Sequence, residues 1–371
     1  MTAERDMAGF VIPFTIGAAL ASAFQQADIH TSIHMTGATF LAAASCLSVL
    51  SYGIRNQLKT SILLTTIVLS GICCGILCGE LGSSHFRLPV PGNGPVFRIA
   101  QNFGQNMKAV LADIPFADGR TNAIATALIT GDRSWLTSED IEIFRKSGAS
   151  HILALSGMHL GIIYGLLKAL FAGFGGSQSA RRLKSCLNIL VCGFYTLSTG
   201  SGPSIVRAFI FIALTETAHL SGRRTNLKCT LFAALLIQLI LTPQDITNVG
   251  FQLSYAAMAG IAFIFPWLKN FWPEAGKGWT GKVLKRVWDS AALSIACQIT
   301  TAPIAFVYFG TFPEYFLLTN LLSVPIIGIT IPAILFTSLL SCCGICPELF
   351  VKVTESLMNT LIQSLSVISS L

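Results

Sequence analysis

The stretch GDRSWLTSEDIEIFRKSGASHILALSGMHL, residues 131–160, changes from polar to apolar halfway along its length. The polar half predicts a short surface helix, because Thr137 can cap its start and Asp140 stands at the third helical position, as in a capping box. Gly148 is the residue type that helix ends prefer for a left-handed final turn. We therefore predict a short helix that begins after Thr137 and ends before Gly148.

The apolar half carries polar residues at the point where a membrane segment would begin: His151, Ser156 and His159, with Gly157 between them. Polar groups facing hydrocarbon are costly, so such residues usually face a bundle interior or a water-filled cavity. Ser156 and His159 share one helix face, a pairing also found in hydrolases, but no third orienting group accompanies them. We predict that they line the mouth of a passage through the membrane. The alternatives are hydrolysis by Ser156 with His159 and metal binding by the two histidines.

The composition predicts an all-α polytopic membrane protein. The chain of 371 residues is 53% hydrophobic and 11% charged, and its mean hydropathy is +0.68. Its apolar residues fall in runs of about 18–25 residues, which is the length of a spanning helix and gives about eleven transmembrane helices. The predicted spans are residues 9–24, 33–54, 61–79, 151–174, 183–199, 204–220, 227–241, 246–268, 288–309, 316–341 and 349–371.

Three regions follow from this pattern. Residues 1–80 hold the N-terminal transmembrane helices, and residues 151–371 hold the main helical bundle. Between them, residues 81–150 form an extracytoplasmic segment that opens with a Pro/Gly-rich crossing at 89–95. Residues 96–111 repeat apolar side chains at helical spacing, which predicts an outer amphipathic helix that lies in the membrane interface or packs on the bundle.

Among the short loops of the predicted bundle, one alternating set carries the basic residues. The other loops, residues 25–32, 200–203, 243–245 and 310–315, contain no Lys or Arg. The positive-inside rule places the basic loops and the N-terminus in the cytoplasm. We therefore predict a multi-pass protein of the cell inner membrane, with the lipid bilayer as its surroundings. The net charge of +7 is explained by these loops and requires no nucleic-acid partner by itself.

The cysteines do not predict a metal site. Most of the eleven lie in apolar runs, where they behave as small hydrophobic residues. Cys342, Cys343 and Cys346 form a C-C-x-x-C cluster, but no second pair or nearby histidine accompanies it. We predict neither a metal nor another cofactor.

Four further polar residues in predicted spans are Arg207, Asn248, Gln252 and Gln298. Arg207 either faces the bundle interior or extends its charge to the interface. The three amides either hold helices together by hydrogen bonds or line a pathway. Glu216 and His219 lie near the cytoplasmic end of the span at 204–220, and we expect them at the interface.

Several motifs together resemble the ComEC competence family. After residues 131–162 they are GSGPSIVRA at 200–208, NVGFQLSYAA at 248–257, QITTAP at 298–303 and TNLLSVP at 319–325. Their order is that of the family. The resemblance implies a channel that carries single-stranded DNA across the inner membrane, with residues 151–371 as its core. The channel lining would then comprise His151, Ser156, His159, Arg207, Asn248, Gln252 and Gln298.

Family members commonly also carry an OB-fold domain and a metallo-β-lactamase-like domain. Residues 80–121 are too few for a five-stranded barrel, and no His-x-His-x-Asp-His pattern occurs. We therefore expect the channel core alone, without enzyme activity, and a separate nuclease or DNA receptor and a cytoplasmic motor as partners. The oligomeric state stays open. A transporter or flippase for another anionic polymer or a lipid-linked substrate is the alternative function.

Overall fold

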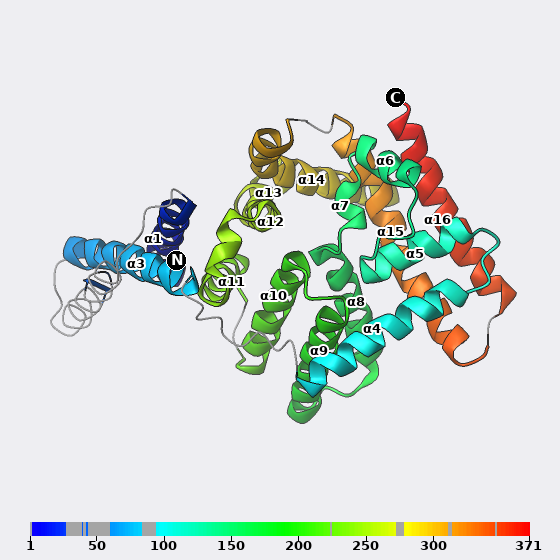
Figure 1. Cartoon of the computed structure of the whole chain (residues 1–371), viewed down its shortest axis with the longest axis horizontal. Helices are drawn as coiled ribbons and strands as arrows, with labels where there is room; N and C mark the ends of the chain where they lie inside the picture. The colour runs from blue at the N-terminus through cyan, green and yellow to red at the C-terminus, as the bar shows by residue number, and fades with distance from the viewer. Residues whose placement is uncertain are drawn as a thin grey trace. The chain divides into compact units, whose positions relative to one another are not determined.

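The structure is a computed structural model that describes residues 2–26, 39, 42–43, 60–83, 94–222, 225–271, 278–310, 314–345 and 347–371. Across these residues every regular element is helical, as predicted (Figure 1). The predicted span 33–54, most of the crossing at 89–95 and Cys346 lie outside the described residues. The described helices long and apolar enough to cross a membrane are Val249–Lys269, Trp279–Phe309 and Phe316–Cys342. Shorter apolar helices are Met7–Ala23, Thr65–Gly79, Gly157–Gly173 and Leu227–Leu241. The count of about eleven spans stays a prediction.

The chain divides into two compact units, the first made of Met1–Val90 and Arg224–Ala262. Its elements are α1 (Thr2–Gln26), α3 (Thr60–Ser83), α11 (Leu227–Leu241), η2 (Pro243–Thr247) and α12 (Val249–Ala259). Helices α1 and α3 approach very closely, because a Cβ at Gly75 would lie 2.0 Å from the carbonyl oxygen of Phe14. Glycine is therefore the residue that this helix contact requires.

The second unit comprises Pro91–Arg223 and Phe263–Leu371. Its first helices are α4 (Pro95–Asp113), α5 (Gly119–Thr130), α6 (Ser138–Lys146), α7 (Ser150–Leu153) and α8 (Gly157–Leu170). They are followed by η1 (Phe171–Gly173), α9 (Gln178–Ser198) and α10 (Pro203–Leu220). The last are α13 (Phe265–Lys269), α14 (Trp279–Phe309), α15 (Phe316–Cys342) and α16 (Glu348–Ser369), with the π-helix η3 (Gly260–Ile264) at the unit boundary.

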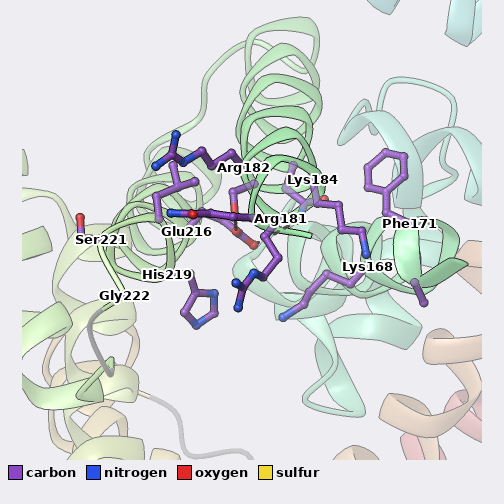
Figure 2. A pocket seen from close by; sticks show the side chains of 14 residues that line it. Lys168, Phe171, Arg181, Arg182, Lys184, Glu216, His219, Ser221 and Gly222 are labelled. Atoms are coloured by element: carbon purple, nitrogen blue, oxygen red, sulfur yellow. Dashed lines mark hydrogen bonds between the residues drawn. The ribbon is translucent and has the colours of Figure 1, made fainter. Parts of the chain in front are cut away.

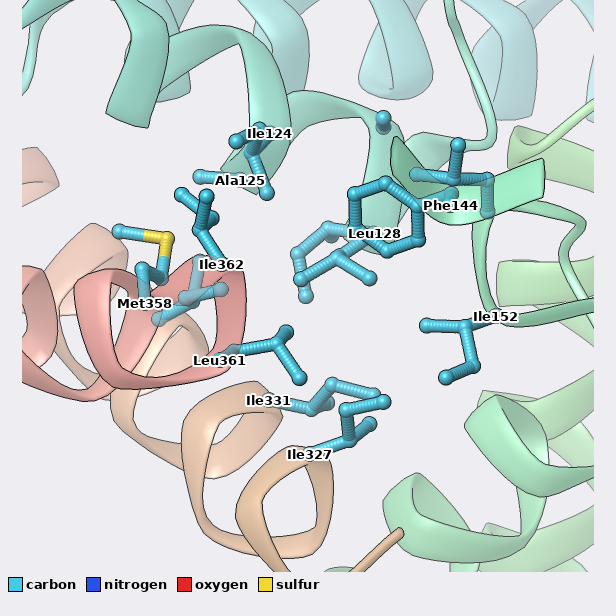
Figure 3. Packing of buried hydrophobic residues seen from close by; sticks show 14 of the residues in the cluster. Ile124, Ala125, Leu128, Phe144, Ile152, Ile327, Ile331, Met358, Leu361 and Ile362 are labelled. Atoms are coloured by element: carbon cyan, nitrogen blue, oxygen red, sulfur yellow. The ribbon is translucent and has the colours of Figure 1, made fainter. Parts of the chain in front are cut away.

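Helix α5 lies at the centre of the second unit, and all of its residues from 121 to 130 are buried. Leu128 packs in one cluster with Phe144 of α6, Ile327 of α15 and Leu361 of α16 (Figure 3). Burial of such side chains contributes about 1.5–3 kcal/mol each when the alternative is exposure to water. Helix α5 belongs to residues 81–150, the predicted extracytoplasmic segment, so part of that segment lies in the core of this unit.

The predicted amphipathic helix is present as α4. One side of it is buried through Ala100, Gly104 and Leu111. Val96 and Ile99 remain 60% exposed. The helix therefore packs on the unit and also presents apolar side chains outward.

The predicted continuous span at 151–174 is interrupted. Helix α7 ends at Leu153, and a second helix, α8, begins at Gly157. Ser156 stands between them in an extended conformation and caps α8 by accepting a hydrogen bond from the backbone N–H of Met158. The break arises because the Ser156 side chain accepts a hydrogen bond from a free backbone N–H at the start of α8. The chain therefore begins a new helix there and does not continue α7.

Candidate functional site

The polar half of residues 131–160 forms the expected helix. Thr137 and Asp140 make the predicted capping box at the start of α6. The carboxylate of Asp140 also accepts a hydrogen bond of 2.6 Å from Nε of Arg120 on α5. Burial opposes ionisation of Asp140, but the hydrogen bonds from Thr137 and Arg120 outweigh it and lower the pKa of the carboxyl group. Gly148 adopts the left-handed conformation predicted for it, with φ 76°.

The Gly-Asp-Arg triplet at 131–133 fixes the position of the interrupted helix. Gly131 ends α5 with φ 75°, and a Cβ there would lie 2.7 Å from Cδ1 of Leu155. Arg133 donates a hydrogen bond of 3.1 Å from Nε to the carbonyl oxygen of Leu153, the last residue of α7. The helix break is therefore held on one side by Ser156 and on the other by Arg133.

Asp132 joins the triplet to the amphipathic helix. Its carboxylate accepts a hydrogen bond of 2.5 Å from Nζ of Lys108 on α4. Hydrogen bonds from Lys108 and Ser134 lower the pKa of Asp132 to about 2. The ion pair is therefore fully formed at neutral pH and ties α4 to the end of α5.

The structure brings Ser156 and His159 together, as their spacing predicts. Nδ1 of His159 lies 3.1 Å from Oγ of Ser156 and accepts from the Ser156 backbone N–H at 3.4 Å. His159 is 1% exposed, and its Nε2 has no hydrogen-bond partner among the described residues. The imidazole is thus a cap on α8 whose second nitrogen faces the interior of the bundle.

Arg207 and Gln298 lie in the same unit as this pair. Arg207 is 2% exposed and donates a hydrogen bond of 3.2 Å to Oγ of Ser204, so its guanidinium is inside the unit. Gly157, at the start of α8, packs next to Ala208, the residue after Arg207. Gln298 is half-buried on α14.

The remaining predicted lining residues make short-range contacts. His151 is exposed on α7, where its Nδ1 lies 3.2 Å from the carbonyl oxygen of Gly148. Asn248 caps α12 by accepting from the backbone N–H of Gly250 at 2.8 Å, and Gln252 donates to the carbonyl oxygen of Ile246. Asn248 and Gln252 belong to the first unit and the other five lining residues to the second. A common lining stays a prediction.

Sequence reasoning missed a buried carboxyl group. We expected Glu216 at the interface, but its side chain is 2% exposed. It accepts hydrogen bonds from Tyr164 of α8 at 2.5 Å, and from Ser185 at 2.5 Å and Asn188 at 3.1 Å on α9. These neutral donors suit a carboxylate, because an ionised carboxyl group accepts hydrogen bonds and donates none. The signal in the sequence was the glutamate itself, because an acidic residue within an apolar helix usually marks a functional interior.

Glu216 forms part of the wall of a pocket of about 690 Å³ at the end of the unit where α9 begins and α10 ends (Figure 2). Its volume is in the range of pockets that hold small ligands. The charged side chains that line it are Lys168, Arg181, Arg182, Lys184 and Glu216, joined by His219. The pocket therefore carries four permanent positive charges around one carboxyl group.

Comparison with known proteins gives one consistent result. The Competence protein family matches residues 128–371. ComE operon protein 3 of Bacillus subtilis (strain 168) is 26% identical over 55% of this chain and 24% of its own length. Competence protein ComA of Neisseria gonorrhoeae is 26% identical over 52% of this chain and 27% of its own.

Protein YcaI of Escherichia coli (strain K12) is 27% identical over 58% of this chain and 28% of its own. The matched region thus spans about a quarter of the length of these three relatives. No solved structure matches.

Proposed function

This chain belongs to the competence protein family, and from that premise we propose that it forms an inner-membrane channel for single-stranded DNA. In this proposal the strand passes into the cytoplasm during natural transformation. The observation that carries it is the family match over residues 128–371, which includes the interrupted helix and the buried polar side chains. The relative named Competence protein ComA supports the same proposal.

The chemistry of the second unit supports a conduit for a polyanion. A strand carries one phosphate per nucleotide, so its passage requires hydrogen-bond donors and positive potential along the route. Nε2 of His159 and the guanidinium of Arg207 supply such groups inside the unit. A broken helix is tolerated at membrane depth where it lines a cavity or is held by its neighbours. We assign no catalytic step to Ser156 and His159.

We place the N-terminus and the basic loops in the cytoplasm, following the positive-inside rule. The Lys108–Asp132 pair and the capping box of α6 then lie on the outer side, where the strand enters. A separate nuclease or DNA receptor on that side and a cytoplasmic motor on the other are the partners that this arrangement calls for.

The proposal is tested with labelled DNA in a strain from which the gene is deleted. We expect surface-bound label to remain and internalised label to fall to background. Complementation with His159→Ala or Arg207→Gln should leave the protein inserted at the normal level and block internalisation. Exposed Arg286 provides a matched control for Arg207, since Arg286→Gln removes the same side-chain type from the surface. Normal internalisation in the deletion strain would contradict the proposal.

The exposed apolar side of α4 favours a second candidate, a transporter or flippase for an anionic lipid-linked substrate. Val96, Ile99 and Phe103 are 60%, 60% and 48% exposed, a surface suited to lipid. Reconstituted vesicles separate the two functions, because a channel for DNA admits an oligonucleotide, whereas a flippase equilibrates a labelled phospholipid between the leaflets.

A further inference from the structure

We propose that the pocket beside Glu216 binds the phosphate groups of a nucleic-acid strand as it leaves the channel. This inference rests on the proposed function and identifies one site of contact with the substrate. The pocket is the place where α8 ends, α9 begins and α10 ends. It is at the opposite end of these helices from Ser156 and Arg207, which lie near the start of α8 and of α10.

The hydrogen-bond donors of the pocket come from three separate helices and share one cavity. Lys168 lies in the last turn of α8, Arg181 in the first turns of α9, and His219 in the last turn of α10. Figure 2 shows the end groups of these three side chains directed to the same side of the pocket, whereas Arg182 points the other way. A phosphate seated there would meet donors from three directions.

No acid in the part of the chain that the structure describes pairs with Lys168, Arg181, Arg182 or Lys184. Nζ of Lys184 does donate to the carbonyl oxygen of Gly175 at 3.2 Å, and Nζ of Lys168 lies over the ring of Tyr164. Glu216, the acid of the pocket wall, is instead satisfied by neutral hydroxyl and amide donors. Its carboxyl group forms no ion pair with these four basic side chains, and four basic groups against one acid leave the pocket with a net positive charge.

Backbone dipoles add to this charge. Helix α9 begins at Gln178, after Ser177 caps it by accepting from the backbone N–H of Ala180 at 3.1 Å. The start of a helix carries partial positive charge and favours anions within its first turn. Gln178 lines the pocket, so this end of α9 faces the same cavity as the cationic side chains.

Membrane topology alone would explain why basic residues lie at this end of the helices. It does not explain why they line one pocket. The positive-inside rule counts charges near the ends of spans and is indifferent to how they are arranged. Exposed Lys282 and Arg286 on α14 belong to another predicted cytoplasmic loop and do not line the pocket. They supply a matched control with the same change in charge.

The test uses the full chain in nanodiscs of phosphatidylcholine and measures binding of a fluorescent oligothymidylate by anisotropy over a range of salt concentrations. For Lys168→Gln/Arg181→Gln we expect binding about tenfold weaker than wild type at low salt. The slope of log K against log salt should fall by about 1.4, since each lost phosphate contact on a single strand contributes about 0.7. Lys282→Gln/Arg286→Gln should stay within twofold of wild type.

Three outcomes overturn the inference. Equal weakening in both double variants would show general attraction to the basic end without a specific pocket. Full competition by millimolar inorganic phosphate, with no dependence on strand length, would indicate a site for free phosphate. In a parallel sample whose nanodiscs also contain phosphatidylglycerol, loss of that bound lipid from the pocket variant in native mass spectrometry, with oligothymidylate binding unchanged, would indicate a lipid site.

The transformation assay keeps this inference separate from the proposed function. If the deletion strain fails to internalise DNA but Lys168→Gln/Arg181→Gln internalises it normally and binds the strand as wild type does, the channel stands and the pocket proposal falls. If the purified protein shows the expected pocket-dependent binding while the deletion strain transforms normally, the pocket binds strands and the transport function falls.

Discussion

Replacing Glu216 by alanine tests whether the buried carboxyl group holds three helices together. The change removes the acceptor for Tyr164 on α8 and for Ser185 and Asn188 on α9. Ser185 is 7% and Asn188 3% exposed, but both line the pocket with Glu216, so water can replace part of the lost partner. A buried donor left unsatisfied costs about 1–3 kcal/mol, and hydrogen bonds between membrane helices average about 0.6 kcal/mol, so the cost here falls at the low end of that range.

For the three bonds together we expect a loss of about 3 kcal/mol in the free energy of unfolding. In a unit of this size that corresponds to a melting temperature lower by about 6–12 °C. A thiol-reactive fluorescent dye provides the assay in a background whose other cysteines are replaced by serine, because exposed Cys186 would otherwise react in the folded protein. Cys192 is fully buried next to this network and reacts only when the helices separate. Glu216→Gln should fall between wild type and alanine, since its amide keeps one acceptor oxygen but adds a donor.

The matched control is Glu355→Ala, which removes a half-buried carboxylate that makes no hydrogen bond or ion pair with described residues. We expect it to melt within about 2 °C of wild type, the usual range for a substitution away from specific contacts. If Glu216→Ala and Glu355→Ala melt at the same temperature, the reasoning about the carboxyl group is refuted.

Three further predictions concern the triplet at 131–133. Gly131→Ala should destabilise the protein by about 1–3 kcal/mol, because alanine is strained at positive φ and its Cβ would press on Leu155; an unchanged melting temperature would contradict this. Arg133→Gln should reduce DNA internalisation while the protein still inserts, because the carbonyl group at the end of α7 loses its donor; normal internalisation would remove Arg133 from the site. Because the folded-state pKa of Asp132 is lowered to about 2, the stability from its pair with Lys108 is present above the unfolded value of 3.8 and is lost as pH falls through about 2. In thermal melts the stability difference between wild type and Asp132→Asn should therefore be the same at pH 7 and pH 5 and should shrink between about pH 4 and pH 2. A difference that stays constant down to about pH 2 would show that the pair does not lower this pKa.

Local features of the fold could be predicted from the sequence because their causes lie within a few residues. The capping box needs only Thr137 and Asp140 one turn apart, and the left-handed helix end needs only Gly148. The all-helical class follows from long apolar runs, since a helix is the structure that satisfies its own backbone in a membrane. The ordered motifs likewise indicated the family before any coordinates.

The tertiary structure alone decided which polar groups meet. Glu216 was expected at the interface because it lies near the cytoplasmic end of its span. Its hydrogen-bond partners lie 28, 31 and 52 residues away on two other helices, so they could not be identified from the residues around it in the sequence. In the same way the break before α8 depends on Arg133, which reaches a carbonyl group 20 residues later in the chain. Sequence patterns record the period and polarity of each helix, whereas burial and charge at a site depend on which helices pack together.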